Sequence, residues 1–327
     1  MERRTLGSTG LAVTPIGLGL AALGRPAYID LGRARDLGPD RSVEVMEARC
    51  HLMLDAAYAS GVRYVDAARS YGRAEEFLGS WLRERAGAVG DVTVGSKWGY
   101  TYVADWRMDA DVHEVKDHSV ETLRRQVGES RAALGDRLAL YQIHSATLES
   151  GVLEDRAVLA ELLALRRGGL AIGLSVSGPR QADAIRRALE ARIDEANPFQ
   201  AVQATWNLLE PSAGAALAEA KASGWGVLVK EALANGRLTP HRHEAAVEQL
   251  ERIGADRGAA ADQVALAAAL ANPWADVVLS GAVTPEQLES NLRALAVELG
   301  SDELEALETL AEPPEAYWAA RGSLPWS

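Results

Sequence analysis

Three short apolar runs in this chain end in side chains that could do chemistry together. The stretch 63–72 is a β-branched and aromatic run that reaches Asp66, and Tyr71 follows five residues later. Lys97 and His144 stand in the same way at the ends of two later apolar runs. Where parallel strands lie side by side, their carboxyl ends share one edge, and sites form there. If the three runs are neighbouring strands, an acid, a phenol, an amine and an imidazole converge.

These four groups suit proton transfer to a carbonyl oxygen. A lysine ammonium beside a tyrosine hydroxyl favours the phenolate and lowers the pKa of the phenol. An aspartate paired with the lysine keeps it charged, and a histidine can orient a carbonyl oxygen or relay a proton. Such a set fits protonation of a developing alkoxide, and therefore reduction of a carbonyl by hydride. Each residue alone is more often structural; their combination on adjacent strand ends indicates catalysis.

Composition excludes several other classes of protein. The chain has 327 residues with 34 basic and 46 acidic side chains, a net charge of −12, which does not suit a nucleic-acid partner. Its one cysteine, Cys50, excludes an intrachain disulfide and fits a reducing compartment. No run approaches the roughly 20 apolar residues of a membrane span. We expect a cytoplasmic protein that binds neither nucleic acid nor membrane, and its oligomeric state is left open.

Strands and helices alternate along the chain. Helices are expected at 43–60, 74–85, 119–134, 157–167, after 179, at 212–223, twice between 243 and 270, from 284, and near 302–310. Between them, short apolar runs end near residues 19, 66, 97, 144, 175, 205, 230 and 280. The runs are continuously apolar rather than alternating, as expected for strands covered on both faces.

Eight such units predict an α/β fold, a closed (β/α)8 TIM barrel, which typically takes about 250 residues. The stretch around Gly7–Gly10 predicts an N-terminal β-hairpin. Long carboxyl-face loops after the first and third strands, with a C-terminal helix and tail, account for the remaining length. No linker is evident, so residues 1–327 are interpreted as a single domain. A doubly wound open sheet is the alternative.

Two motifs are rejected. Gly17, Gly19 and Ala22 match a G-x-G-x-x-A dinucleotide fingerprint, but that motif requires a helix to begin at once, and an irregular stretch follows instead. His113 and His118 are five residues apart, whereas a zincin helix needs histidines four apart. We therefore expect no metal.

Along nearly its whole length the chain resembles the aldo-keto reductase family. The resemblance is carried by the hairpin 6–13, by Asp66 with the segment 70–75, and by the strand ends at Lys97 and at 141–144. It implies an enzyme that reduces an aldehyde or ketone to an alcohol with NADPH, less often NADH. By resemblance Tyr71 is the general acid, Lys97 tunes it, Asp66 holds the lysine and His144 orients the carbonyl.

The resemblance also implies a cofactor site. Its positions in this sequence are Ser175 and Gln203 for the nicotinamide carboxamide, Lys230 against the ring, Gly281, Ala282, Thr284 and Gln287 for the phosphates, and Asn291 for the adenine. Val176 stands where the family usually has asparagine, and Lys230 cannot stack as an aromatic residue does. Thr284 and Gln287 form a capping-box pattern with Pro285 at the first helical position, which favours anion binding. A plain helix cap explains the same pattern.

The expected cofactor is NADP, with NAD possible. A 2′-phosphate needs arginine or lysine, and Gly281 and Gln287 stand where many relatives have basic side chains. We expect NADPH to lead only modestly. Trp98 and Trp106, in and after the third strand, are candidates for the substrate pocket, and Trp318 and Trp326 for a cover over the barrel mouth.

Three functions remain open at this point. The first is an NAD(P)H-dependent carbonyl reductase or alcohol dehydrogenase. The second is a cofactor-binding barrel that acts as a redox sensor or regulatory subunit with little turnover. The third is a cofactor-free isomerase or lyase, which would leave Gln203 and the capping pattern without a role. The sequence does not reveal the carbonyl or alcohol substrate or the physiological direction.

Overall fold

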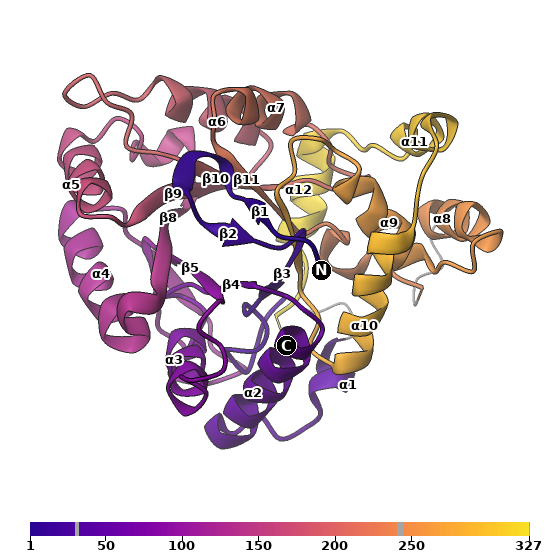
Figure 1. Cartoon of the computed structure of the whole chain (residues 1–327), viewed down its shortest axis with the longest axis horizontal. Coiled ribbons are helices and arrows are strands. Elements are labelled where there is room, and N and C mark those ends of the chain that lie inside the picture. Colours follow the sequence, from indigo (N-terminus) through magenta and orange to yellow (C-terminus); the bar gives the residue numbers. More distant parts are fainter. Residues whose placement is uncertain (30–32, 241–244, 327) are drawn as a thin grey trace.

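Eight parallel strands close into a barrel in the computed structural model of the chain, which describes residues 1–29, 33–240 and 245–326 (Figure 1). Each strand pairs with its neighbour in chain order, and the last pairs with the first, so the sheet has no edge. The strands are β3 (Ile16–Gly19), β4 (Tyr64–Asp66), β5 (Thr93–Trp98), β8 (Leu138–Ala146), β9 (Ala171–Val176), β10 (Ala201–Thr205), β11 (Gly226–Lys230) and β12 (Val277–Ser280). The predicted barrel is confirmed, and the open sheet was wrong.

Helices surround the barrel, one or more after each strand (Figure 1). They are α2 (Val43–Ala59), α3 (Ala74–Glu84), α4 (Val120–Leu134), α5 (Arg156–Arg167), α6 (Gln181–Glu190), α7 (Gly214–Ala222), α8 (Ala245–Ala255), α9 (Ala261–Leu270), α10 (Pro285–Arg293), α11 (Ser301–Glu308) and α12 (Pro314–Gly322). Two loops contain elements that the sequence did not predict: α1 (Arg33–Leu37), and a hairpin of β6 (Tyr100–Tyr102) and β7 (Glu114–Lys116). Both are too short to show a periodic pattern.

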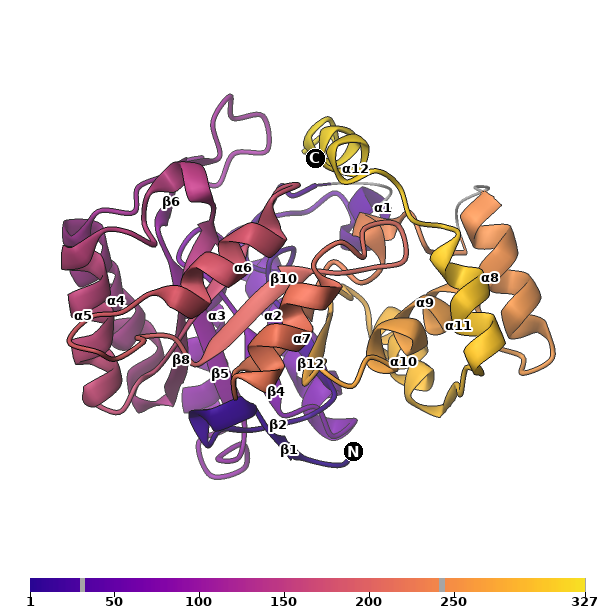
Figure 2. The same cartoon turned by 90° about the horizontal axis from the view of Figure 1, so that it is seen from above.

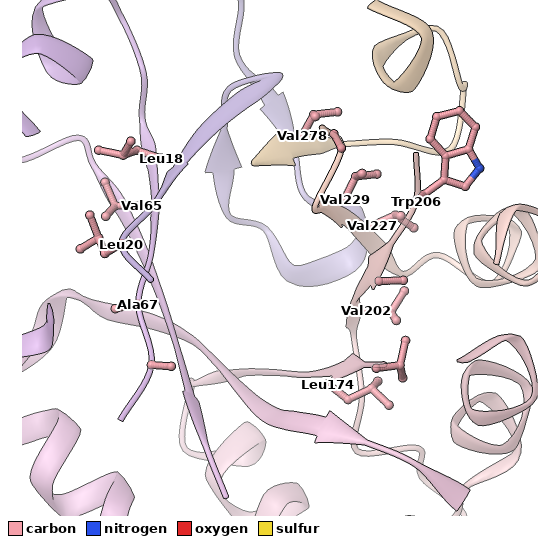
Figure 3. Packing of buried hydrophobic residues seen from close by; sticks show 14 of the residues in the cluster. Leu18, Leu20, Val65, Ala67, Leu174, Val202, Trp206, Val227, Val229 and Val278 are labelled. Atoms are coloured by element: carbon pink, nitrogen blue, oxygen red, sulfur yellow. The ribbon is translucent and has the colours of Figure 1, made fainter. Parts of the chain in front are cut away.

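Residues alternate along each strand between the helices and the barrel interior. Leu18, Val65, Leu174 and Val202 belong to the apolar layer beneath the helices (Figure 3). The alternate residues face inward, and near the amino end some of them, such as Tyr64 beside Val65 and Ala201 beside Val202, belong to a second, smaller cluster. Because the side-chain period is two, the register of each strand decides which polar residue reaches the interior.

The amino end of the barrel is plugged. The hairpin of β1 (Arg4–Thr5) and β2 (Ala12–Val13) lies across that end, while α12 and β6 lie at the other (Figure 2). Leu6 in the hairpin turn is fully buried, and a Cβ at Gly226 would lie 2.4 Å from its Cγ. Apolar packing therefore closes this end of the barrel interior.

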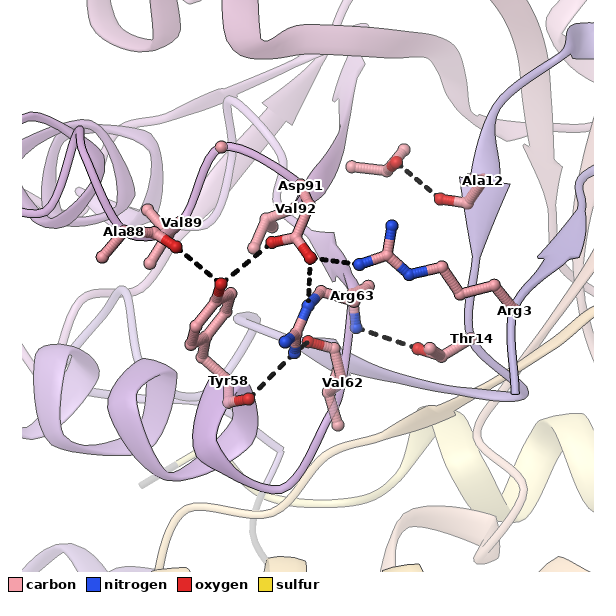
Figure 4. Close-up of polar contacts among 12 residues, drawn as sticks. Arg3, Ala12, Thr14, Tyr58, Val62, Arg63, Ala88, Val89, Asp91 and Val92 are labelled. Carbon is pink, nitrogen blue, oxygen red and sulfur yellow. Dashed lines mark hydrogen bonds and ion pairs between the residues drawn. The ribbon is translucent and has the colours of Figure 1, made fainter. Parts of the chain in front are cut away.

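A polar cluster ties the amino-end segments together (Figure 4). Asp91 accepts hydrogen bonds from Arg63, Tyr58 and Arg3. Partial burial would raise the pKa of Asp91, but these hydrogen bonds outweigh it and hold the pKa at about 2. The backbone N–H of Arg63 also donates to Thr14 Oγ1 at 2.9 Å, which joins the start of β4 to the segment before β3.

Tyr64 points into the barrel interior, where two glycines make room for its ring. A Cβ at Gly17 would lie 2.8 Å from Tyr64 Cδ1, and a Cβ at Gly95 would lie 2.2 Å from the phenol oxygen. The ring therefore crosses the barrel interior, and its hydroxyl donates to Asp66 Oδ1 at 3.2 Å. Glycine within β5 is needed for this packing rather than for a turn.

We expect Gly95→Ala to destabilise the fold by about 1–3 kcal/mol, because the new methyl group overlaps the Tyr64 hydroxyl. Urea denaturation would measure the change. Tyr64→Phe removes the oxygen that clashes with the new methyl group. Adding Gly95→Ala to Tyr64→Phe should therefore cost less stability than adding Gly95→Ala to the parent. A Gly95→Ala protein as stable as the parent would contradict this account of the packing.

Candidate active site

The four predicted catalytic side chains meet at the carboxyl end of the barrel. Asp66 ends β4, Lys97 lies in β5, His144 lies in β8, and Tyr71 follows β4 in its loop. The Lys97 ammonium contacts the Asp66 carboxylate, and its Nζ lies 3.3 Å from the Tyr71 hydroxyl oxygen. The rings of Tyr71 and His144 meet edge to face with centroids 5.5 Å apart. The structure thus brings all four together.

Each of the three N–H donors of Lys97 has an acceptor. They are an oxygen of Asp66, the backbone oxygen of Ala67 at 2.9 Å, and the Tyr71 hydroxyl oxygen. An ammonium can only donate, so the Tyr71 oxygen is the acceptor in that contact. The O–H of Tyr71 is therefore left to donate to another group.

Asp66 is held on both carboxylate oxygens. One contacts Lys97, and the other accepts from the Tyr64 hydroxyl and from Gln203 Nε2, at 3.2 and 3.0 Å. Asp66 is 2% exposed and Lys97 1% exposed. A buried ion pair is stable only when its remaining hydrogen-bonding capacity is satisfied, and here strands from both sides of the barrel satisfy it.

Burial raises the pKa of Tyr71 well above 10, and the carboxylate of Asp66 raises it further. The sequence predicted the opposite direction, on the ground that Lys97 would favour the phenolate. That prediction was wrong for the net shift in the protein alone, because burial and the Asp66 carboxylate outweigh what the lysine contributes. Tyr71 is therefore a protonated phenol at neutral pH, ready to act as a donor.

His144 is a neutral imidazole. Burial lowers its pKa well below 6.5, and the nearby cations Lys97 and Arg25 lower it further. Its Nδ1 lies 3.3 Å from Ser70 Oγ, and its backbone oxygen accepts from His118 Nε2 at 2.9 Å. The Ser70 contact holds the ring beside Tyr71, the His118 contact holds the backbone, and the side chain lines the cavity described next.

A cavity of about 860 Å³ opens at this end of the barrel. The candidate catalytic residues Tyr71 and His144 line it together with Tyr100 and Gln203, and it extends to the first turns of α10. Its size suits an organic ligand. Six of the eight predicted cofactor positions line it: Gln203, Lys230, Gly281, Ala282, Gln287 and Asn291.

The other two cofactor positions do not line the cavity. Ser175 Oγ accepts from the backbone N–H of Ser145 at 2.9 Å, and Ser145 itself lines the wall. Thr284 caps α10 by accepting from Gln287 N at 3.3 Å. The side chain of Gln287 in turn accepts from Val283 N at 3.0 Å, one residue before the position a capping box uses.

The tryptophans predicted for the substrate pocket lie elsewhere. Trp98 is fully buried with its ring 5.7 Å from that of His118, and Trp106 packs on Phe77 and donates to the backbone oxygen of Arg41 at 2.7 Å. Neither lines the cavity. Trp98 ends β5 pointing outward, one residue past the inward Lys97, which the strand alternation explains.

The C-terminal tail covers the mouth through one of its two tryptophans. Trp326 lines the cavity, whereas Trp318 packs beside Arg321, whose Cζ lies 5.3 Å from the ring centroid. Arg321 in α12 forms an ion pair with Glu231, which follows β11. Burial would raise the pKa of Glu231, but Lys230 and Arg321 hold it at about 2. This pair fastens α12 to the barrel.

Sequence reasoning missed several residues of the wall, among them Arg25, Tyr28, Glu114 and Glu231. They come from loops that no motif marks. In the part of the chain that the structure describes, no three His, Cys, Asp or Glu side chains gather as a metal site. His113, one of the rejected zincin histidines, stacks on Trp326 with centroids 4.6 Å apart.

The sequence model described as the Aldo/keto reductase family matches residues 15–312 of the chain. The chain belongs to this family. The resemblance noted from the motifs is thereby confirmed, and oxidoreductase activity follows in general terms. Among the described residues of this aldo/keto reductase, no helix combines the length and apolar character of a membrane span.

The chain is also similar to individual proteins, some of which are named as aldo-keto reductases. "Aldo-keto reductase str7" of Strobilurus tenacellus is 28% identical over 331 residues, which cover 91% of this chain and 92% of the relative. "Pyridoxal 4-dehydrogenase" of Microbacterium luteolum is 31% identical over 161 residues, 44% of this chain and 43% of the relative. An aldo-keto reductase from Bacillus halodurans, solved in its holo form, superposes with a TM-score of 0.70 at 20% identity, over 96% of this chain and 97% of that one. That last likeness shows the fold alone.

We expect Asp66→Asn to destabilise the protein by about 3–5 kcal/mol, because it leaves the buried Lys97 ammonium without a countercharge. Urea denaturation at neutral pH measures this. The double variant Asp66→Asn/Lys97→Met should be less destabilised than Asp66→Asn. If the double variant were the less stable of the two, the pair would not carry the electrostatic role assigned to it.

Proposed function

We propose that this aldo/keto reductase transfers hydride between a nicotinamide cofactor, NADP or NAD, and the carbonyl carbon of a small aldehyde or ketone. One observation carries the proposal: Lys97 uses the Tyr71 oxygen as an acceptor, so the Tyr71 O–H is free to donate beside a neutral His144. The redox-sensor reading uses the same cofactor site and differs only in turnover.

The cavity wall fits such a cofactor. Gln203, Lys230 and Ser177 would hold the nicotinamide end near Tyr71, and the wall at Gly281 and Ala282 would hold the phosphates. At the far end, Asp262 is buried in the wall and its Oδ1 has no hydrogen-bond partner among the described residues. A buried carboxylate oxygen is costly without a donor, and an amino or hydroxyl group of an adenosine would supply one. The cofactor, when bound, supplies the hydride.

The protein's own part is to orient the carbonyl and supply the proton. The neutral His144 and the Tyr71 O–H both face the cavity, where a carbonyl oxygen can accept from either. As the carbonyl carbon gains hydride, its oxygen becomes an alkoxide and takes the Tyr71 proton. Lys97, held by Asp66, then stabilises the phenolate that remains. In the reverse direction the same phenolate removes the alcohol proton.

Aromatic side chains surround the substrate end of the cavity, namely Tyr28, Tyr100 and Trp326. This wall favours a flat or aromatic carbonyl substrate. The partial match to a protein named pyridoxal 4-dehydrogenase supports including pyridoxal and related aromatic aldehydes in a substrate screen. Oxidation of NADPH or NADH with a panel of such carbonyls is the test of the function. Binding of cofactor without turnover of any of them would favour the sensor instead.

We expect Tyr71→Phe to lose about 10²–10⁴ in turnover, because the general acid is gone while the ring remains. Its NADH and NADPH dissociation constants, from quenching of tryptophan fluorescence, should stay close to the parent values. A Tyr71→Phe enzyme with near-normal turnover would refute the assignment of the acid.

The cofactor preference follows from the far end of the cavity. Gln287 Nε2 donates to Asp36 Oδ2 at 2.7 Å, and Asp36, Asp262 and Glu286 line the wall there; among the described residues the cation beside them is Arg35. The sequence led us to expect NADPH modestly ahead. These carboxylates would repel the added charge of a 2′-phosphate, so we propose that NADH binds at least as tightly as NADPH.

Replacing Asp36 by Asn should therefore tighten NADPH several-fold and leave NADH nearly unchanged. Dissociation constants for both nucleotides measure this. Glu289→Gln is the matched control, because it makes the same charge change on α10 outside the cavity wall. Adding Gln287→Arg to Asp36→Asn should increase NADPH preference further. A selective loss of NADPH binding in Arg35→Gln, with no effect of Asp36→Asn, would show that Arg35 reads the 2′-phosphate.

A further inference from the structure

Arg25 brings a second buried cation to Tyr71. Its side chain is 2% exposed, and its Cζ lies 5.2 Å from the centroid of the Tyr71 ring. It lies in the loop after β3 and lines the cavity together with Tyr71. The motif-based assignment of roles gives it none.

Hydrogen bonds on two sides fix the guanidinium. Nε donates to the backbone oxygen of Ala21 at 3.1 Å, and Nη1 donates to the backbone oxygen of Ser70 at 3.2 Å and to Glu114 Oε2 at 3.0 Å. Ser70 directly precedes Tyr71, so Arg25 grips the loop that carries the phenol. Glu114 lies in β7, and its contact joins the β6–β7 hairpin to the same point.

Aromatic rings complete the enclosure. Cζ of Arg25 lies 4.4 Å from the centroid of Tyr28 and 4.8 Å from that of Trp326. A guanidinium over ring faces is attracted by their quadrupoles, more strongly when it is shielded from water. The arginine is therefore held in one place by the first loop, the β6–β7 hairpin and the C-terminal tail.

The backbone beside Arg25 packs directly on the tyrosine loop. The N–H of Arg73 donates to the backbone oxygen of Gly24 at 2.7 Å, and a Cβ at Gly24 would lie 2.3 Å from the backbone oxygen of Tyr71. No side chain fits between the two segments. A displacement of Arg25 would therefore shift the backbone of Tyr71.

We propose that Arg25 is a positioning residue for Tyr71 and that the Arg25–Glu114 pair sets how readily Tyr71 gives up its proton. The proposal rests on the proposed function, in which Tyr71 is the acid. It adds a control on that acid from the cavity side, separate from Lys97.

Electrostatics gives the two members of the pair opposite effects. Burial is the largest cause of the raised pKa of Tyr71; Asp66, Tyr28 and Glu114 raise it further, while Arg25 lowers it. Lys97, which is paired with Asp66, the neutral His144 and the protonated Tyr64 also lie near the phenol. Loss of Arg25 should therefore raise the pKa of the phenol, and loss of the Glu114 charge should lower it.

The test is the pH dependence of alcohol oxidation in Arg25→Met, Arg25→Lys and Glu114→Gln, with 4-nitrobenzyl alcohol and saturating NAD or NADP as the probe. Oxidation needs the Tyr71 phenolate, so its rate rises with pH to a plateau. The midpoint of that rise is the apparent pKa of the phenol. We expect the midpoint to move down by about half a pH unit or more in Glu114→Gln and up by a similar amount in Arg25→Met, about threefold in each proton dissociation constant. Arg25→Lys keeps the charge and should stay nearest the parent.

Phenolate absorbance, measured for each variant against the same variant carrying Tyr71→Phe, reports the ionisation without turnover. Opposite shifts in the two variants support the proposal, and Glu114→Gln alone tests it if Arg25→Met does not fold. Midpoints that stay in place or move the same way, with activity lost, would show that Arg25 only supports the loop. If the absorbance midpoints shift as expected in the variants but the parent enzyme neither oxidises nor reduces any probe, the proposed function is refuted instead.

Discussion

The buried ion pair of Lys97 and Asp66 is the interaction on which the rest of the site depends. Removing an ammonium and a carboxylate from water costs several kcal/mol for each ion, and their attraction offsets this only when the remaining hydrogen bonds are made. Here they are made by Tyr64 from within the same strand as Asp66, by Gln203 from β10, and by the backbone of Ala67. The last donor of the lysine is thereby directed at Tyr71. The orientation of the Tyr71 hydroxyl is a consequence of satisfying the pair.

The barrel makes that arrangement possible by closing its opposite end. Tyr64 needs an empty position beside it to reach Asp66, and Gly95 supplies it. Below, the hairpin around Leu6 fills the amino end with apolar side chains. The four candidate catalytic side chains lie at the other end, where the interior meets the loops. The same closure leaves the barrel sheet without an edge, so each barrel strand keeps its register and its inward residues.

The loops then decide what surrounds the acid. Arg25, Glu114 and Trp326 come from segments far apart in the chain, and they meet over the Tyr71 side of the cavity. At the other end, Asp36 reaches Gln287 across a separation of 251 residues. The strands and the loop after β4 place the four candidate catalytic side chains, whereas we propose that these other loop residues tune proton transfer and cofactor choice.

The sequence by itself determined the eight-stranded barrel and its strand ends, because short apolar runs between helices allow few other arrangements. It also determined the convergence of Asp66, Tyr71, Lys97 and His144, because the carboxyl ends of parallel strands share one edge. Only the tertiary structure decided the outward direction of Trp98, the use of Ser175 by Ser145, and the raised pKa of Tyr71. Each depends on which neighbour fills a particular space. The contact of Arg25 with Tyr71 was also visible only in the tertiary structure, because no sequence pattern links an arginine in an irregular loop to a tyrosine 46 positions later. Burial and contacts between distant parts of the chain set these properties, and the local spacing of residues predicts neither.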